Sequence, residues 1–211
     1  LQRVNLHVES LFNRHRFALR ALPPEELAAP LDVRGNFHGA SLANLDKWHG
    51  QIFSQLEFTD AVIWRHWLDL PKELASGRGA VRSWLSVEAG SVTGITADLA
   101  LYNVAARLAE DAPEMLLSYL RGRAAWKDVA GGFELDIQKL AVRLHDGAEL
   151  QPTDLYLRTV KSINGKPATG VVRTNLLQLE KIALLASYLP LEAGLRARLE
   201  AVLDQRFGKR V

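Results

Sequence analysis

Hydrophobic and polar residues alternate along two stretches between Gly79 and Tyr102, with a turn at residues 88–91 between them. Successive side chains of a β-strand point to opposite faces, so this alternation indicates strands with one buried face. The apolar residues that would share that face are Val81, Leu85, Val87, Ile95, Ala97, Leu99 and Leu101. The stretch therefore predicts an antiparallel hairpin with one apolar and one polar face.

The same alternation recurs on both sides of this hairpin. It predicts further strands at residues 4–8, 16–20, 31–38, 52–58, 120–127, 133–144, 154–158 and 172–176. Asp146-Gly147 and Asn164-Gly165 are strong turn signals between neighbouring strands. The apolar residues change parity near Lys139, which predicts a β-bulge that bends the sheet.

Two regions change to helical spacing. Asp60 can cap a helix whose apolar residues include Ile63 and Trp67, and Pro71 ends it. From Leu179 onward the leucines again recur at helical intervals. We therefore expect a mainly β (α+β) fold, with an antiparallel, curved β-meander sheet of about ten strands, flanking helices and a C-terminal helical segment.

Length and hydrophobic content favour one unit, because 211 residues that are 48% hydrophobic can bury a core. We expect a single β-rich segment over 1–211. Its parts would be N-terminal strands at 1–58, a helix at 59–71, a β-meander at 77–178 and C-terminal helices at 179–207. Since the chain begins at Leu1, we expect it to be a piece of a longer protein.

The charge of the chain is nearly balanced. The 26 Lys and Arg residues are scattered among 24 Asp and Glu residues, so nucleic-acid binding is not indicated. The absence of cysteine excludes disulfides and thiolate metal sites but leaves the compartment open. No stretch approaches the roughly 18 apolar residues that span a bilayer.

Catalytic and metal motifs are missing from the sequence. The six histidines form no HxH, no HExxH and no pair at i and i+4, so we predict no metal site and no cofactor. His38 and His49 could meet across a hairpin, but all the histidines fall on polar faces or beside turns, which favours surface residues. Residues 39–43 only half resemble a nucleophile elbow. We therefore predict that the chain is not an enzyme. A hydrolase that uses Ser41 with one of the histidines is the alternative.

The predicted apolar face is the remaining candidate for a functional site. It could be an ordinary core covered by the C-terminal helices, or it could curl into an uncovered groove that holds acyl chains. Periodicity does not separate these two interpretations. The candidate groove residues are Leu85, Ile95, Leu99, Leu101, Leu135, Ile137, Leu155 and Leu157.

Several short stretches that together span most of the chain carry a further indication. They are residues 29–39, 45–48 and 59–61, the tryptophans Trp64 and Trp67, residues 77–84, and residues 176–190 with the ending Ala186-Ser-Tyr-Leu-Pro190. These stretches contain structural motifs and no catalytic signatures. They resemble an internal segment of the YhdP proteins, which are long AsmA-like envelope proteins of Gram-negative bacteria related to TamB.

This resemblance implies a periplasmic segment of a protein anchored in the inner membrane elsewhere in its chain. It also implies a hydrophobic β-groove that carries phospholipid towards the outer membrane, and no catalytic residues. Head groups would lie at a polar rim near residues such as Arg82 or Arg158. The alternative is a non-catalytic scaffold of the envelope with a fully packed core, whose edge strands or C-terminal helix bind a partner protein.

Overall fold

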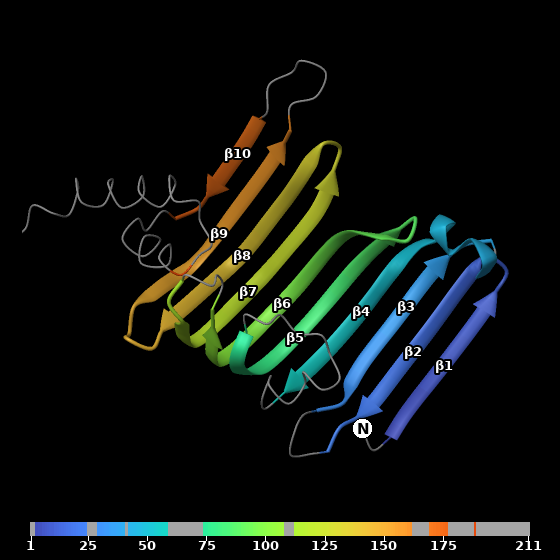
Figure 1. The fold of residues 1–211 in the computed structure, drawn as a ribbon, viewed down its shortest axis with the longest axis horizontal. Coiled ribbons are helices and arrows are strands. Elements are labelled where there is room, and N and C mark those ends of the chain that lie inside the picture. The colour runs from blue at the N-terminus through green and yellow to red at the C-terminus, as the bar shows by residue number, and fades with distance from the viewer. Residues whose placement is uncertain are drawn as a thin grey trace, which may run out of the picture.

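The computed structural model describes residues 3–24, 29–40, 42–58, 74–107, 112–161, 169–176 and 188. These residues form one ten-stranded sheet, and Figure 1 shows the strands side by side from β1 to β10. Every neighbouring pair is antiparallel, and the order in the sheet is the order in the sequence. The predicted mainly β, antiparallel meander of about ten strands is therefore confirmed.

The strands fall into three ranges of length. Those at the N-terminal side have 8–10 residues, those from β5 to β9 have 12–16, and β10 has 6. Their bounds are β1 Arg3–Leu11, β2 Arg14–Leu22, β3 Leu31–His38, β4 His49–Phe58, β5 Leu74–Glu88, β6 Ser91–Ala106, β7 Met115–Val129, β8 Gly132–Leu144, β9 Glu149–Val160 and β10 Thr169–Thr174. A short 3-10 helix, η1 Leu42–Lys47, lies between β3 and β4.

Tight turns join the strands at the predicted positions near Ala89, Gly131 and Gly147, whereas the predicted turn at Asn164-Gly165 lies outside the described residues. Ala89 and Gly90 connect β5 to β6, and both have positive φ angles, of 51° and 75°. Two-residue turns with positive φ at both positions close antiparallel hairpins. We call this end of the sheet, which also carries the β1–β2 and β7–β8 turns, the Ala89 end. The opposite end carries the β8–β9 turn at Gly147 and is called the Gly147 end.

The predicted bulge near Lys139 is confirmed. The pairing of β8 with β9 shifts between Ile137 and Leu140, and Lys139 has a φ of 52°. The backbone N–H of Lys139 donates to Oδ1 of Asp154 at 2.7 Å, which satisfies a group that the bulge removes from the ladder. The bulge restores the apolar parity, so Ile137 and Leu140 face the same side of the sheet.

Among the described residues, the cluster of buried hydrophobic side chains lies at the Gly147 end. Leu117 is 1% exposed and is the largest fully buried side chain among the described residues. Tyr188 packs against this core from outside the sheet. The members of this core, which we call the buried cluster, are Val104, Ala106, Leu117, Val142, Leu144 and Leu150.

The predicted curvature is wrong, because the sheet is open and uncurled, with β1 and β10 as separate edges (Figure 1). The pairs from β1 to β5 run without any register shift, so no bulge bends that half. The predicted helices at 59–71 and, apart from Tyr188, at 179–207 lie outside the described residues. Within the described part, no helix is long and apolar enough to cross a membrane.

Candidate functional site

One row of directly opposed residues crosses the whole sheet on its apolar side. Each member is the cross-strand partner of the next, from the β1 edge to the β10 edge. At about 4.8 Å per strand, such a row is about 43 Å long. We call it the apolar row, and its members are Val8, Phe17, Gly35, Ile52, Leu85, Ile95, Trp126, Leu135, Leu157 and Val172.

The structure brings all eight candidate groove residues onto this side. Leu85, Ile95, Leu135 and Leu157 belong to the apolar row itself. The other four lie in parallel rows towards the Gly147 end. Ile137 is paired with Leu155, Leu99 with Gly122 and Leu101 with Leu120.

These candidates differ in burial from the buried cluster. Ile95 is 37% exposed, and the other seven are half-buried. Leu101 packs against the buried cluster, whose member Leu117 is 1% exposed. The apolar side therefore has a closed part at the Gly147 end and a more accessible part towards the Ala89 end.

Aromatic rings extend this accessible part across the N-terminal strands. Phe17 stacks on Phe37 with ring centroids 6.3 Å apart, and Phe37 lies 6.3 Å from Trp48. Trp48 stacks on His15 at 4.2 Å. We call these four residues the aromatic cluster. It lines an open hollow of 570 Å³ together with Leu6, Val8 and Val87.

The candidate groove residues predicted from the sequence do not include any member of the aromatic cluster. Phe17 and Phe37 follow the alternation and could have been included, because strand parity places them with Leu19 and Val33. Trp48 follows η1, outside any predicted strand, so alternation gave no indication of its position. The glycines beside these rings are the signal that could have located them. The Trp48 ring lies over Gly39 and the Phe17 ring lies over Gly35, where a Cβ atom would collide with each ring.

His15 is held on the apolar side rather than on the polar surface. Its Nε2 donates to the carbonyl oxygen of Gly39 at 3.0 Å, and its Nδ1 lies 2.7 Å from Oγ of Ser10. Both ring nitrogens are therefore used in positioning the ring against Trp48. The predicted meeting of His38 and His49 is confirmed, with parallel rings 5.5 Å apart on the other face.

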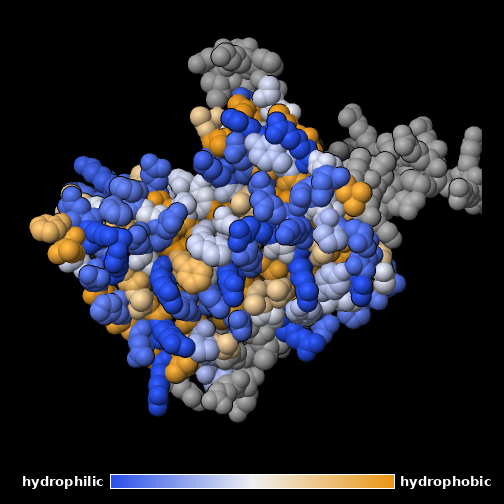
Figure 2. Space-filling view, turned by 180° about the vertical axis from the view of Figure 1, so that it is seen from behind, coloured by the Kyte–Doolittle hydropathy of each residue, from blue (hydrophilic) through white to orange (hydrophobic). Residues whose placement is uncertain are grey.

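The polar face carries pairs of opposite charge along neighbouring strands. Figure 2 shows this side of the molecule, where hydrophilic side chains predominate and hydrophobic ones lie scattered between them. Ion pairs on this face are Arg16–Glu9, Arg34–Asp32, Arg123–Asp98, Arg143–Glu149 and Arg158–Glu134.

Arg82 and Arg158 lie on this polar face, so the predicted rim position of both is wrong. Arg82 is opposite Asp98, and Arg158 is ion-paired to Glu134 at 3.3 Å. Both alternate with apolar-side residues in mid-strand, which turns their side chains away from the candidate site. On the apolar side, polar residues at the Ala89 end include Asp128 and Thr159, which are the cross-strand partners of Phe133.

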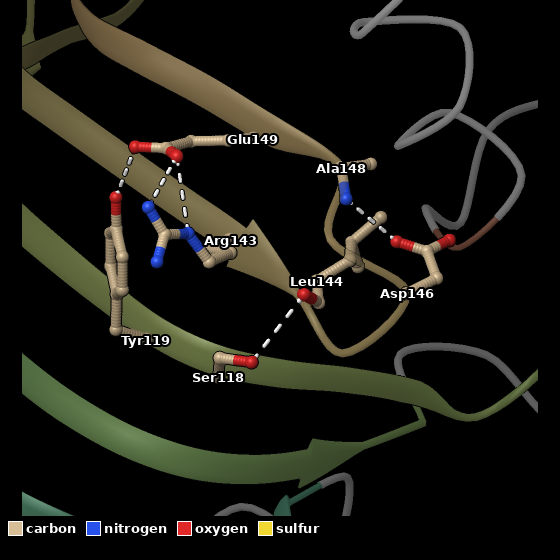
Figure 3. A network of polar contacts seen from close by, with 7 residues as sticks. All are labelled: Ser118, Tyr119, Arg143, Leu144, Asp146, Ala148 and Glu149. Atoms are coloured by element: carbon tan, nitrogen blue, oxygen red, sulfur yellow. Dashed lines mark hydrogen bonds and ion pairs between the residues drawn. The ribbon is translucent and has the colours of Figure 1, made fainter.

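Tyr119, Arg143 and Glu149 form the most connected polar group of the β7–β9 region (Figure 3). The Tyr119 hydroxyl donates to Oε1 of Glu149 at 2.5 Å, and Nη2 of Arg143 donates to Oε2 at 2.6 Å. These bonds lower the pKa of Glu149, with Tyr119 as the larger cause, and the same bond raises the pKa of Tyr119. The group ties three strands together on the face opposite the apolar row.

The described residues contain no cluster of three or more His, Asp or Glu side chains that could hold a metal ion. Ser41, the alternative nucleophile, lies outside the described residues. The candidate site is therefore a surface of apolar and aromatic side chains.

Comparison with known proteins identifies a family match. Residues 1–203 match the model of a family described as YhdP protein. No curated protein and no solved structure matches the chain. The family match covers nearly the whole chain and agrees with the resemblance drawn from the sequence.

Proposed function

This chain belongs to the YhdP family, and on that premise we propose that its apolar row carries phospholipid acyl chains. The protein would act as a segment of a Gram-negative envelope protein, on the periplasmic side of an inner membrane to which other parts of the longer protein are anchored. Its part in transfer between the two membranes would be passive, without catalysis.

The unbroken apolar row is the observation that supports this proposal. Every strand contributes an apolar residue or, at Gly35, a glycine under the ring of Phe17. A continuous apolar surface of this length is unusual on a monomeric soluble protein and indicates a binding function. Because the row runs perpendicular to the strands, it offers a linear path from one sheet edge to the other.

The energetics of such a surface favour movement of an acyl chain along it over tight binding of the chain at one position. Burying one methylene group against apolar atoms contributes about 0.8 kcal/mol. On an open surface only one side of an acyl chain loses contact with water, so each position contributes less. Similar side chains repeat from strand to strand, so a chain that slides by one strand exchanges one contact for an equivalent contact.

The hollow at the aromatic cluster supplies a second element of the proposal. Its rings are rigid and mostly apolar, and they lie next to Val8 at the β1 end of the apolar row. We place the polar head group at the Ala89 end, where the apolar side meets the turns. Arg82 and Arg158 have no part in this arrangement, since they face the other way.

The experiment compares Ile95→Asp with Thr96→Asp in the full chain, exported to the envelope of a Gram-negative bacterium and purified without detergent. Ile95 and Thr96 are neighbours in β6 whose side chains lie on opposite faces, so the two variants introduce the same charge at the same place. Lipid mass spectrometry would measure co-purified phospholipid. Circular dichroism and thermal unfolding would establish that both variants fold.

We expect phospholipid with the parent chain and with Thr96→Asp, and a large loss with Ile95→Asp. A photoreactive amino acid at position 95 should also cross-link to phospholipid, and one at position 96 should not. A lipid-free parent, or equal lipid in both aspartate variants, would contradict the proposal.

A scaffold with a packed core is the second candidate, because the buried cluster is core of that kind. It predicts that Ile95→Asp destabilises the fold about as strongly as a charge placed among the buried cluster, with no lipid in the parent. The two measurements above therefore separate it from the lipid-carrying function.

A further inference from the structure

The polar face of strands β5–β8 carries five exposed arginines within three neighbouring cross-strand rows. In each row the residues are directly opposed from strand to strand, and successive rows lie about 6.7 Å apart along the strands, the length of two residues. Figure 2 shows this face, where hydrophilic side chains predominate. We call the group the arginine–tyrosine patch. Its rows are Arg78–Tyr102–Tyr119–Arg143, then Ala80–Ala100–Arg121–Ala141, then Arg82–Asp98–Arg123.

Positive charge exceeds negative charge in this patch. Arg123 donates to both carboxylate oxygens of Asp98, at 2.6 and 2.8 Å. Arg143 is paired in the same way with Glu149 of β9, at 2.6 Å. The arginines of the patch that form no ion pair with any carboxylate of the described residues are Arg78, Arg82 and Arg121.

A further carboxylate, that of Glu57 in β4, lies at the margin of the patch. Glu57 is opposite Ala80 and forms no ion pair with the arginines of the described residues. Even with Glu57 included, five arginines face three carboxylates. The patch therefore attracts anionic groups.

Aromatic rings hold Arg121 in position. Its guanidinium carbon lies 5.0 Å from the ring centroid of Tyr102 and 5.9 Å from that of Tyr119. The guanidinium also donates a hydrogen bond to the Tyr102 hydroxyl. These contacts restrict the side chain but leave its charge without a counter-charge. Binding of an anion by Arg121 therefore costs less side-chain entropy than binding by an unrestrained arginine.

The three unpaired arginines are spread over an area that one small anion does not span. Arg78 and Arg82 are four residues apart in β5, about 13 Å, and Arg121 lies two strands away, about 10 Å. A single small anion on this open face would contact one or two arginines and stay largely hydrated. A polypeptide that carries several carboxylates can contact all three arginines at once.

Carboxylate side chains of a polypeptide match both the chemistry and the spacing of the patch. On one face of an extended strand, side chains recur about every 6.7 Å, which is the distance between the rows. The pair of Arg123 and Asp98 already has two parallel hydrogen bonds between a guanidinium and a carboxylate on this face. A membrane surface fits less well, because the short alanines between the arginines do not enter a bilayer.

We propose that the arginine–tyrosine patch binds an acidic segment of a partner protein, whose Asp and Glu side chains pair with Arg78, Arg82 and Arg121. The patch lies on the face opposite the apolar row. A partner can therefore bind there while the apolar row is occupied. The proposal does not depend on the lipid-carrying function.

The test measures binding of a fluorescent peptide, in which Glu alternates with Ala, to the full chain by fluorescence anisotropy. The patch variant combines Arg78→Gln, Arg82→Gln and Arg121→Gln. The control variant removes the same net charge from exposed arginines elsewhere on the polar face, and it combines Arg16→Gln, Arg34→Gln and Arg158→Gln. Circular dichroism and thermal unfolding would establish that both variants fold.

We expect the patch variant to bind the peptide about tenfold more weakly than the parent, the combined effect of losing three exposed ion pairs. The control variant should bind the peptide about as the parent does. The affinity of the parent should fall with added salt, because exposed charges are screened. A second peptide, with Gln in place of Glu, should not bind.

A parent that does not bind the acidic peptide would overturn the proposal, and so would equal losses of affinity in the two variants. Phosphatidylglycerol vesicles decide between a polypeptide and a lipid surface. Vesicles that bind the parent when the peptide does not would assign the patch to a membrane surface instead.

Discussion

The ring of Phe17 in β2 lies directly across Gly35 in β3, at the apolar row. A methyl group on Gly35 would lie 2.1 Å from Cε1 of Phe17, far inside van der Waals contact. The close approach lets the ring lie flat against the sheet and keeps the row continuous at a position that has no side chain.

Gly35→Ala should therefore displace Phe17 and destabilise the fold by about 1–3 kcal/mol, the usual range for overpacking. Urea unfolding measures the effect. Gly170→Ala in β10 is the matched control, because its nearest neighbour would be the carbonyl oxygen of Arg158 at 3.9 Å, an ordinary contact. Equal stability of the two variants would mean that Phe17 does not need the space above Gly35.

Leu117→Ala and Leu155→Ala compare the closed and the accessible parts of the apolar side. Leu117 is fully buried, so its truncation should cost about 3 kcal/mol through lost burial and a residual cavity. Leu155 is half-buried, and its truncation should cost about 1 kcal/mol, because less apolar area returns to water. Thermal or urea unfolding of both variants gives the comparison, and equal costs would contradict the division of the face into two parts.

Asp98→Asn tests the charge pairs of the polar face through pH. Arg123 donates to both carboxylate oxygens of Asp98, at 2.6 and 2.8 Å, and these bonds lower the pKa of Asp98 below its ordinary value. A carboxylate with a lowered pKa in the folded state stabilises the protein above its unfolded-state pKa, which is about 3.9. That contribution is lost as the pH falls through the lowered folded-state value.

The parent should therefore exceed Asp98→Asn in free energy of unfolding at neutral pH, and the difference should shrink in strong acid. Urea titrations at a series of pH values measure it. The difference should also fall with added salt, because the pair is partly exposed. A difference that stays constant with pH would show that the pair contributes no linked stability.

Asp154→Ala tests how the bulge of β8 is held. Asp154 accepts the N–H of Lys139 through Oδ1 and the side-chain amide of Asn175 through Oδ2 at 3.3 Å. Its removal should cost about 1 kcal/mol, the usual net value of a hydrogen bond, and should speed hydrogen exchange at Lys139. Gln151→Ala, in the same strand, should leave the exchange of Lys139 unchanged.

Much of this fold follows from the sequence because the strands are local and alternate clearly. In β5 and β6, for example, alternation predicts the faces of Val81 to Leu85 and of Ile95 to Leu101, and these two stretches pair without a shift; the register shift between Ser86 and Val87, next to the turn, was not predicted. The parity change at Lys139 even locates a bulge from the pattern alone. All eight candidate residues share one side of the sheet for the same reason.

Other features depend on contacts that alternation does not encode. The sequence does not show whether a sheet rolls up, since closure depends on twist and bulges summed over many strands. Alternation also predicts the face on which a residue lies but not how deeply that residue is buried. Leu117 and Leu155 therefore look alike in the sequence, although only Leu117 is buried. Trp48 lies in the candidate site although it belongs to no strand, because Gly39 leaves room for its ring.

The strictly sequential order of the ten strands has a consequence for how this molecule is assembled. None of these ten strands needs a distant segment of the chain as its first pairing partner, because each one pairs with the strand that precedes it in the sequence. Contacts between near neighbours in sequence lower the entropy lost in closing loops and favour rapid folding. A polypeptide that becomes available N-terminus first can therefore form one hairpin at a time, and each completed edge strand is the template for the next strand.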